Sequence, residues 1–425
     1  MYLVYVLLTY LLAPVVIAME GWKALWSPEY RGRLHQRLGF VKREPKPGAI
    51  WVHAVSVGEV QAAAGLIRGL QGRFPEATII ITTVTPTGAQ RAKALFGESV
   101  RHCYLPYDLP GSVRRFLNRV RPSVAIILET EIWPTLYRVL GHRRIPLVLA
   151  SARVSEKSVD RYRRMARLFK ETLSHGLVIG AQSAADAERF KAIGAPAERI
   201  AITGNVKFDM RIPEAAVGAG RDWRARHAPN RPVWVAGSTH EGEEDAALDA
   251  HTKIRARHPR ALLILVPRHP QRFEAVRNLL KKANVRFAER GRGEDPGERE
   301  AVFLVDTLGE LQAFYAASDV AYVGGSLVPV GGHNLLEPAV LGLPVLSGPY
   351  TQNAQEIADL LRQAGAVDIV GDANELAERV TSLFDDPENA RATGVRGQAA
   401  AAGSRGAVDR LIAMIEPLIN LRRDG

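Results

Sequence analysis

The chain has 425 residues, of which 47% are hydrophobic and 24% charged, a composition typical of a globular protein with room for two or three domains. Its formal net charge of +11 favours anionic partners such as phosphorylated substrates, phospholipid surfaces or nucleic acid. A single cysteine, Cys103, excludes an intramolecular disulfide and a multi-cysteine metal site, and we expect it to be a small core residue.

The amino-terminal stretch from Met1 to Ala18 has no charged side chain and consists mostly of Leu, Val, Tyr and Ala. Its length is close to the minimum for crossing a bilayer, and no cationic residue precedes it as in a secretory signal. We therefore expect residues 1–20 to form an uncleaved membrane anchor. The alternative is a buried core helix, with which Pro14 in the middle of the stretch is compatible.

Cationic residues follow this stretch, and by the positive-inside rule they keep the rest of the chain in the cytoplasm. They are Lys23, Arg31, Arg33, Arg37, Lys42, Arg43 and Lys46. Trp22, Trp26 and Tyr30 lie where an interfacial aromatic belt is expected. The sequence thus predicts an anionic membrane surface as a partner.

From Ala49 onward, short apolar runs alternate with segments of helical pattern. The runs are Ile50–Val55, Ala77–Thr83, Val124–Leu128, Pro146–Ala150 and Gly176–Gly180, and the first helical patterns cover Gly58–Phe74 and Gly88–Leu95. Apolar strands that are separated by helices and buried on both faces predict an α/β fold with a doubly wound parallel sheet.

A polar stretch from Met210 to Pro232 interrupts this rhythm, and we interpret it as a linker with a short helix. Strand patterns then resume at Val233–Gly237, Ala261–Val266, Val302–Val305 and Val320–Val323, with a charged loop expected over Glu289–Glu300. We predict Rossmann-like domains over residues 21–211 and 212–425. Such domains bind ligands beyond the carboxyl ends of their strands, so we expect a cleft between the two.

The stretch Gly324–Pro338 gives the strongest indication of a ligand site. It joins the last of these strands to an apolar helix pattern, and its glycine pairs permit sharp turns and close approach of a ligand. With Asn334 as N-cap, free amide groups and the positive helix end would face a phosphate, and Glu337 could accept two hydrogen bonds from a ribose diol. The pattern predicts a nucleotide site. The alternative is a glycine-rich turn whose glutamate only favours the helix dipole.

Glu59 follows the first apolar run, and we expect Gly58 to make a tight strand-to-helix turn that places this carboxylate at the start of a helix. A carboxylate in that position can act as a general base for a hydroxyl group. The alternative is a first-turn glutamate that only complements the helix dipole.

Two further segments place charged residues after strands of the first half. Glu129 and Glu131 follow Val124–Leu128 at the expected cleft edge, although Pro134 indicates a turn there. The alternatives are a solvated loop or a charge at the N-terminus of a helix. Lys207 lies just before the polar stretch and could meet negative charge on a departing phosphate, or could be simply solvated.

In the second half, Arg268 follows an apolar strand and suits an anionic group, and Glu310 lies in a loop that could reach a base. The segment Gly237–Glu244 is another turn into a helix. No metal site is expected, because no zinc-type spacing or Asp-x-Asp pair occurs and the histidines are separated. Those histidines are His53, His240, His269 and His333. The absence of a Gly-x-Ser-x-Gly elbow argues against Ser-His-Asp catalysis.

Taken in order, these motifs resemble the 3-deoxy-D-manno-octulosonic acid (Kdo) transferase family of lipopolysaccharide synthesis over essentially the whole chain. The matching segments are Met1–Ala18, His53–Glu59, Thr83–Gly88, Tyr104–Asp108, Glu129–Pro134, Ala152–Arg153, Gly204–Asp209, Ser238–Glu244, Pro267–Pro270 and Gly324–Glu337. The resemblance implies an inverting GT-B glycosyltransferase with an anchor in the inner (cytoplasmic) membrane and catalytic domains on its cytoplasmic face. It implies transfer of Kdo from CMP-Kdo to a phosphorylated lipid A precursor, lipid IVA, without metal or other cofactor.

The resemblance also implies roles for individual residues. Glu59 would be the general base, and Glu129 and Lys207 would assist the transition state. The residues expected to hold CMP are Pro267, Arg268, Leu308, Gly309, Glu310, Asn334, Leu335, Leu336 and Glu337. Two departures from the family pattern are Asn205, where serine is common, and Pro329-Val330, where charged residues are frequent. Neither is expected to touch the groups named above.

Two other functions are compatible with parts of the sequence. A GT-B transferase or epimerase that uses a UDP-sugar would explain Gly324–Glu337 equally well, but not the anchor together with the first-half motifs. A membrane-surface scaffold for nucleic acid would use the positive charge. The cations, however, form no aromatic-interleaved stripe or recognition helix, so no nucleic-acid partner is expected.

Overall fold

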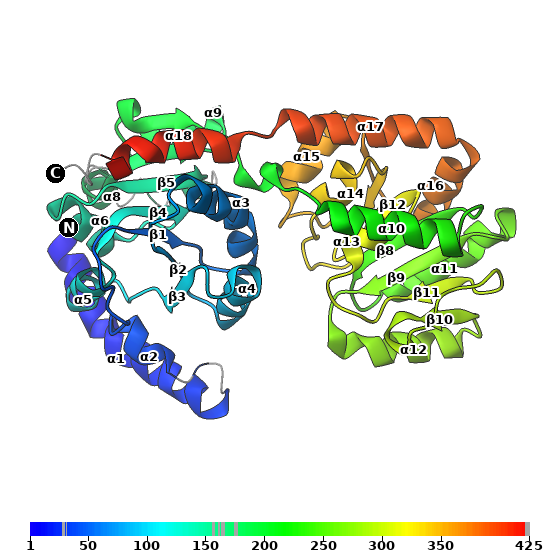
Figure 1. Cartoon of the computed structure of the whole chain (residues 1–425), viewed down its shortest axis with the longest axis horizontal. Coiled ribbons are helices and arrows are strands. Elements are labelled where there is room, and N and C mark those ends of the chain that lie inside the picture. The colour runs from blue at the N-terminus through cyan, green and yellow to red at the C-terminus, as the bar shows by residue number, and fades with distance from the viewer. Residues whose placement is uncertain are drawn as a thin grey trace. The chain divides into compact units, whose positions relative to one another are not determined.

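The computed structural model describes residues 1–27, 30, 32–154, 158–159, 162, 166–173 and 177–420, so Arg31 and Gly176 lie outside the described residues. The chain forms two compact units, unit 1 with Met1–Asp209 and Ser404–Gly425, and unit 2 with Met210–Gly403. Each unit is built around its own parallel sheet (Figure 1). The predicted fold class of two Rossmann-like α/β domains is confirmed.

The sheet of unit 1 has seven parallel strands in the order β3-β2-β1-β4-β5-β6-β7. The strands are β1 Ala49–His53, β2 Ile79–Thr83, β3 Arg101–Tyr104, β4 Pro122–Leu128, β5 Leu147–Ala152, β6 Leu177–Ala181 and β7 Ile200–Ile202. The central strands are apolar throughout because helices cover both faces of the sheet. In β1, Trp51 packs on one face against Phe116 at a ring distance of 5.0 Å, while Ile50 and Val52 belong to the core on the other face.

Helices α5, α6 and α9 cover one face of this sheet, and α3, α4 and α18 cover the other. The helices of unit 1 are α1 Tyr2–Trp26, α2 Arg33–Arg37, α3 Val57–Arg73, α4 Pro86–Phe96, α5 Pro110–Val120, α6 Pro134–His142, α8 Ala166–Leu173, α9 Ala184–Ala192 and α18 Ala407–Asn420, with 3-10 turns η2 Ala197–Arg199 and η3 Val206–Asp209. As expected, the lone cysteine Cys103 is a buried core residue.

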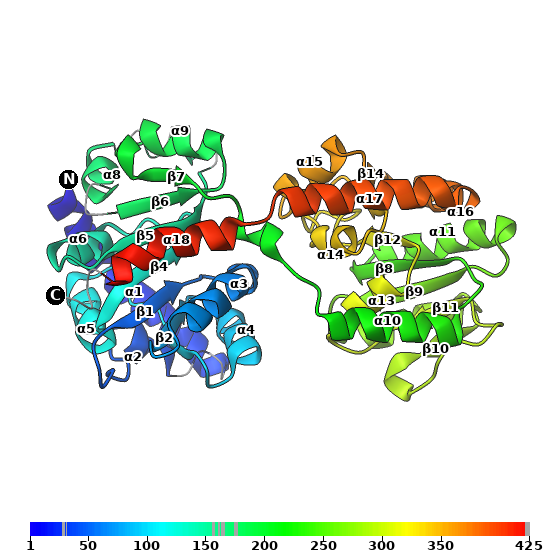
Figure 2. The same ribbon diagram turned by 45° about the horizontal axis from the view of Figure 1, so that its top comes forward.

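The last helix of the chain, α18, belongs to unit 1 and lies beside α3 along the face of the sheet (Figure 2). Its residues Leu411, Ile415 and Ile419 are buried in the same core as Ile67 and Leu70 of α3. The compact units therefore differ from the boundaries expected from sequence, which placed the whole of 212–425 in the second domain. The apolar stripe of α18 shows that the helix packs on a core, but nothing local in the sequence specifies which sheet it covers.

Helix α1 begins at Tyr2, contains Pro14 and ends at Trp26. In the part of the chain that the structure describes, α1 is the helix that is long and apolar enough to cross a membrane. Its most apolar window has a mean hydropathy of 2.2. None of its residues is fully buried in the protein, which contradicts the alternative of a buried core helix.

Of the seven cations expected at a membrane surface, six lie among the described residues, and two of these six are buried. Arg33, only 4% exposed, lies between the rings of Tyr30 and Tyr104, with its guanidinium carbon 4.6 Å from each ring centroid. Arg37 donates to the Leu105 carbonyl oxygen at 2.7 Å. The expectation that they face lipid is wrong, because these guanidinium groups fasten α2 to the sheet. Lys23, Lys42, Arg43 and Lys46 are exposed.

The sheet of unit 2 also has seven parallel strands, in the order β10-β11-β9-β8-β12-β13-β14. The strands are β8 Val233–Thr239, β9 Leu262–Pro267, β10 Phe287–Glu289, β11 Val302–Leu304, β12 Val320–Val323, β13 Val345–Ser347 and β14 Val367–Ile369. Strands β10 and β14 have three residues each, and their sequences do not have the long apolar pattern that identifies the central strands.

The helices of unit 2 are α10 Glu214–His227, α11 Glu243–Arg257, α12 Phe273–Lys282, α13 Leu311–Ala316, α14 Leu336–Val340, α15 Gln355–Gln363, α16 Ala373–Asp385 and α17 Pro387–Gly403, with 3-10 turns η4 Pro270–Arg272 and η5 Arg290–Arg292. Helix α10 falls in the stretch interpreted as a linker with a short helix, and the helix is present, but it packs on the core of unit 2 and is not part of a linker. Its Trp223 is buried and stacks on Phe303 of β11, with ring centroids 5.2 Å apart. One tryptophan thus makes a polar helix part of the core.

Candidate functional site

In unit 1, strands β1 and β4 are central neighbours, and the strand order reverses between them. Ligands of open α/β sheets bind beyond the carboxyl ends of the strands at such a switch point. Glu59 follows β1, and Glu129 follows β4. The topology therefore places two of the residues predicted to be catalytic after the two strands beyond which a ligand is expected.

Glu59 lies in the first turn of α3 and is half-buried. Its Oε2 accepts a hydrogen bond from the Val55 backbone N–H at 2.8 Å, and Ser56 Oγ lies 3.4 Å from Oε1. Burial raises the pKa of Glu59 to about 7; the bond from Val55 opposes this, and the charges of Glu129 and Glu131 add to it. A carboxyl group with this pKa exchanges a proton readily near neutral pH.

Gly58 does not make the turn that we expected of it. It lies inside α3 without a positive φ, and a Cβ atom there would come no closer than 4.0 Å to Ser56 Oγ. Because Ser56, as the N-cap, already has extended backbone, the chain enters the helix without needing a glycine.

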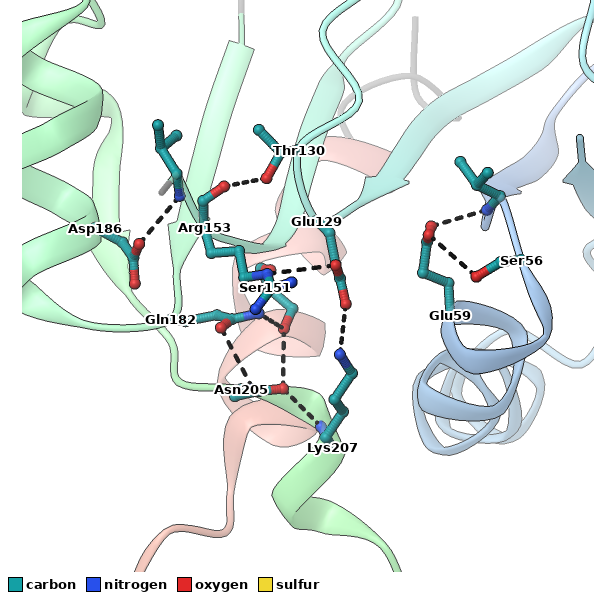
Figure 3. A network of polar contacts seen from close by, with 12 residues as sticks. Ser56, Glu59, Glu129, Thr130, Ser151, Arg153, Gln182, Asp186, Asn205 and Lys207 are labelled. Atoms are coloured by element: carbon teal, nitrogen blue, oxygen red, sulfur yellow. Dashed lines mark hydrogen bonds and ion pairs between the residues drawn. The ribbon is translucent and has the colours of Figure 1, made fainter. Parts of the chain in front are cut away.

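Glu129 is held between two cations. Its Oε1 lies 2.7 Å from Lys207 Nζ, and its Oε2 lies 3.5 Å from Arg153 Nε (Figure 3). Its backbone has a φ of 57°, in the left-handed region that a glutamate rarely adopts. Such strain persists only where the surroundings impose it, and it is concentrated at functional sites. Lys207, predicted from a distant segment, thus lies beside Glu129.

A buried amide network lies beside Lys207 and bonds to its backbone (Figure 3). Asn205 Oδ1 accepts the Lys207 backbone N–H at 2.9 Å, and Asn205 Nδ2 donates to Gln182 Oε1 at 3.3 Å. Ser151, also left-handed with a φ of 52°, lies within hydrogen-bond distance of both amides. The expectation that Asn205 touches none of the predicted catalytic residues is wrong, because its side chain folds back on the following turn.

Glu131 does not join this group of charges. Its Oε2 accepts the Trp133 indole N–H at 2.9 Å, and its carbonyl oxygen accepts the Tyr137 hydroxyl at 2.7 Å. Burial raises the pKa of Glu131, and the bond from Trp133 opposes this. Helix α6 begins at Pro134, as that proline indicates, so the two glutamates lie in a turn and point to different partners.

In unit 2 the switch point lies between β8 and β12. The side chain of Glu243, fully buried in the first turn of α11, organises this edge. Its carboxylate accepts backbone N–H bonds from Gly325 at 2.6 Å and from Ser326 and Leu327 at 2.9 Å, and accepts the Tyr322 hydroxyl at 2.7 Å. The protein's own carboxylate therefore occupies these three amides of the glycine-rich loop, which leaves them unable to donate to a phosphate.

Three histidines meet at the same edge. His240 and His333 stack with ring centroids 5.0 Å apart and Nε2 atoms 2.8 Å apart, and the His269 ring lies 5.1 Å from His240 at 85°. Burial, followed by the charge of Arg268, lowers the pKa of His333 to about 4. We noted these histidines as separated in sequence, and the fold brings these three together. Within the described part of the chain, no group of three or more His, Cys, Asp or Glu residues could hold a metal ion.

The segment Asn334–Glu337 lies at the start of α14, but Asn334 is not its N-cap. The helix begins at Leu336 with Leu335 as cap, while Asn334 Oδ1 accepts the Leu336 N–H at 3.1 Å. Asn334 Nδ2 lies 3.5 Å from Glu337 Oε1, so the predicted diol acceptor and its neighbour lie together. The side chains of Leu335 and Leu336 are buried, and only their backbone could meet a ligand.

The other predicted nucleotide contacts lie at or after the ends of the neighbouring strands β9 and β11, at the same edge. Pro267 ends β9, and the exposed Arg268 donates its backbone N–H to the Thr239 carbonyl oxygen at 3.0 Å. Leu308 and Gly309 precede α13, with Leu308 exposed. Glu310 pairs with Arg290 at 2.8 Å, and this pairing lowers the pKa of Glu310.

Two doubly wound domains with polar residues at the carboxyl edge of each sheet define the GT-B class of sugar-nucleotide enzymes. Solved structures share this fold. A UDP-GlcNAc 2-epimerase from Neisseria meningitidis matches with a TM-score of 0.57 at 16% identity, over 86% of this chain and 100% of that one. A glycosyltransferase from Rickettsia africae matches with a TM-score of 0.56 at 13% identity, over 89% and 99%. At these identities the likeness concerns the fold alone.

Sequence comparison identifies the family. Residues 32–210 match the family model described as 3-deoxy-D-manno-octulosonic-acid transferase (kdotransferase). The chain is 41% identical to the 3-deoxy-D-manno-octulosonic acid transferase of Haemophilus influenzae over 96% of each protein, and 36% identical to that of Bordetella pertussis over 92% of this chain and 91% of the other. The chain therefore belongs to the Kdo transferase family of glycosyltransferases, as the sequence motifs indicated.

Proposed function

We propose that this protein transfers Kdo from CMP-Kdo to a phosphorylated lipid A precursor, lipid IVA, with inversion at the anomeric carbon. Unit 1 carries the acceptor side of the reaction and unit 2 the donor side. The single observation that best supports this reaction is Glu59, a half-buried carboxyl with a pKa of about 7 beside the switch point of unit 1. The relatives named above support the choice of sugar.

In the proposed reaction, Glu59 takes the proton of an acceptor hydroxyl, and the hydroxyl oxygen attacks the anomeric carbon of Kdo. The bond from that carbon to the phosphate oxygen breaks, and CMP leaves. Direct displacement inverts the configuration, as in glycosidases whose base activates water. Lys207 supplies positive charge for the anionic sugar or leaving group, and Glu129 holds Lys207 through the 2.7 Å pair.

Unit 2 is proposed to bind CMP at the edge formed by the loops after β8, β9, β11 and β12. Glu337 would accept the ribose hydroxyls and Arg268 would meet the phosphate, with Asn334 fixing Glu337. The remaining contacts are assigned to Pro267, Leu308, Gly309, Glu310, Leu335 and Leu336. Glu243 contributes indirectly, because it holds the glycine-rich loop in one conformation.

We place the protein at the inner membrane, with both units on the cytoplasmic face. Helix α1 supports membrane association. The exposed cations after it, Lys23, Lys42, Arg43 and Lys46, support an anionic surface.

The test is mass spectrometry of a lipid A precursor incubated with CMP-Kdo and the purified protein. The expected product is heavier than the acceptor by one or more Kdo residues, and an unchanged acceptor would contradict the proposal. A thermal-shift titration distinguishes the alternative of a UDP-sugar enzyme, because a ligand stabilises only a protein that binds it. CMP should raise the melting temperature and UDP should not.

A further inference from the structure

The two long faces of helix α1 have different surroundings. Among the partly covered residues of α1, six recur every three or four positions, which places them along one stripe of the helix: Tyr2, Tyr5, Thr9, Ala13, Ile17 and Glu20. On the outward face, Leu3, Leu7 and Leu11 are 81%, 70% and 71% exposed. The helix therefore lies along unit 1 for most of its length (Figure 1).

Specific contacts fasten this stripe at both of its ends. Near the start, Arg138 of α6 lies over the Tyr2 ring, with its guanidinium carbon 4.5 Å from the centroid, and Tyr5 donates its hydroxyl to Asp108 Oδ2 at 2.8 Å. Near the end, Glu20 Oε2 lies 3.9 Å from Nη1 of the buried Arg33.

The bond between Tyr5 and Asp108 ties α1 to the folded domain, because Asp108 also holds the start of α6. Asp108 is buried, and its two carboxylate oxygens also accept the backbone N–H groups of Thr135 and Leu136, both at 2.8 Å, which caps the first turn of α6. Removal of α1 would leave this carboxylate without one of its three donors. A buried polar group that loses a partner is costly, so the helix is fixed in this position.

This arrangement conflicts with a transmembrane path. Tyr2 and Glu20 are about 27 Å apart along a helix that rises about 1.5 Å per residue, close to the roughly 30 Å thickness of the hydrocarbon core. If α1 crossed the bilayer, the groups docked along it, Arg138, Asp108 and Arg33, would lie at depths throughout the hydrocarbon. Charged groups are costly there, and a folded α/β domain cannot follow its helix into lipid.

We propose that α1 lies in the plane of the membrane surface, clasped to unit 1 through Tyr5 and Asp108, and does not cross the bilayer. Its outward leucines, together with Trp22 and Trp26, enter the boundary between headgroups and acyl chains, as in amphipathic helices that bind membranes from one side. The inference rests on the proposed membrane location but not on the proposed reaction.

The first test is a thiol cross-link in native inner-membrane vesicles. A Cβ atom at Gly111 of α5 would lie 3.9 Å from the Tyr10 hydroxyl, so the pair Tyr10→Cys and Gly111→Cys should be joined by a short bismaleimide. The matched control pair, Leu11→Cys with Gly111→Cys, has its second thiol on the outward face and should not be joined. The native Cys103 is buried and gives little background. Absence of the first cross-link, or equal joining of both pairs, would overturn the proposal.

The second test uses Leu3→Cys, which lies on the outward face and leaves the docked stripe intact. In right-side-out spheroplasts, an in-plane helix keeps this thiol away from a membrane-impermeant maleimide outside the cell. Labelling from outside would place the helix start beyond the bilayer and exclude the in-plane position. Both measurements read topology and not transfer, so either can fail while Kdo transfer stands.

Discussion

The carboxyl edges of the two sheets have the same topology but different chemistry. In unit 1, Glu59 and Glu129 are partly exposed, and their carboxylates bond to side chains or to a single backbone amide. In unit 2, Glu243 is fully buried, and its carboxylate bonds to several backbone amides of one loop. The first arrangement allows a carboxyl group to gain and lose a proton, whereas the second fixes a backbone conformation. The comparison predicts that the same substitution, glutamate to glutamine, mainly reduces catalysis at the edge of unit 1 and mainly reduces folding stability at the edge of unit 2.

The largest effect is expected for Glu59→Gln. Loss of a general base reduces turnover by about 10²–10⁴-fold, whereas CMP affinity should be unchanged because the proposed nucleotide residues lie in unit 2. Steady-state kinetics and a CMP titration measure the two quantities. Glu76→Gln, an exposed glutamate in the same unit, is the control. Transfer at nearly the wild-type rate would remove Glu59 from the mechanism.

Glu243→Gln should reduce folding stability rather than chemistry alone. The amide cannot replace a carboxylate that accepts several buried bonds, and bonds to a charged group contribute about 1.5–3 kcal/mol each. We expect unit 2 to lose roughly 3 kcal/mol of unfolding free energy in urea titrations. Glu274→Gln, an exposed first-turn glutamate of α12, should lose almost none. Equal stabilities would show that the loop does not depend on Glu243.

Glu337→Ala should weaken the donor without destabilising the fold. A carboxylate that accepts two ribose hydroxyls contributes roughly 1.5–3 kcal/mol, equivalent to a KM for CMP-Kdo roughly 10- to 150-fold higher. Glu356→Ala, at a first-turn glutamate of α15, provides the comparison. If deoxyribose and ribose nucleotides compete equally with wild-type enzyme, the assignment of the diol is wrong.

The pKa of Glu59, raised to about 7, predicts two dependences on pH. As a base it must be ionised, so kcat/KM should rise about tenfold per pH unit and level off above pH 7. The folded state also binds more protons than the unfolded state between the ordinary value of 4.5 and about 7, so unfolding free energy should fall as pH rises through that window. Glu59→Gln should flatten this fall, and a wild-type slope in the variant would assign the titration to another group.

The smallest effect concerns the exposed cations. Each contributes about 1 kcal/mol near an anionic surface, and salt screens this beyond roughly 8 Å at physiological ionic strength. The triple variant Lys42→Ala, Arg43→Ala, Lys46→Ala should lower the ratio of binding to anionic over neutral vesicles, most strongly at low salt. In that ratio the apolar contribution of α1 cancels. The control is the triple alanine variant of Lys281, Lys282 and Arg286 in unit 2, which removes the same charge and should leave the ratio of anionic to neutral vesicle binding unchanged.

The parts of the molecule that sequence reasoning predicted depend on local patterns. Runs such as Val124–Leu128 are apolar throughout because both faces are covered, and Glu59 lies in the first turn of the helix that follows its strand. The parts that it missed depend on distant partners. Glu243 bonds to amides more than eighty residues away, and the histidine trio comes from three separate loops. The glutamate three residues after His240 was visible in the sequence, but its burial and its role depend on a loop conformation that the sequence does not display.

The return of α18 to unit 1 has a consequence for biosynthesis. Unit 2 is continuous along the chain, and its core is complete once Gly403 has been synthesised. Most of unit 1 precedes unit 2 along the chain, yet part of its core, with Leu411, Ile415 and Ile419, is translated only after the whole of unit 2. Until then one face of its sheet has α3 and α4 but lacks the helix that packs beside α3 and against β4 and β5. Translation of unit 1 therefore starts before that of unit 2, but its core is completed later. A chain cut short before α18 exposes apolar surface that quality control can recognise.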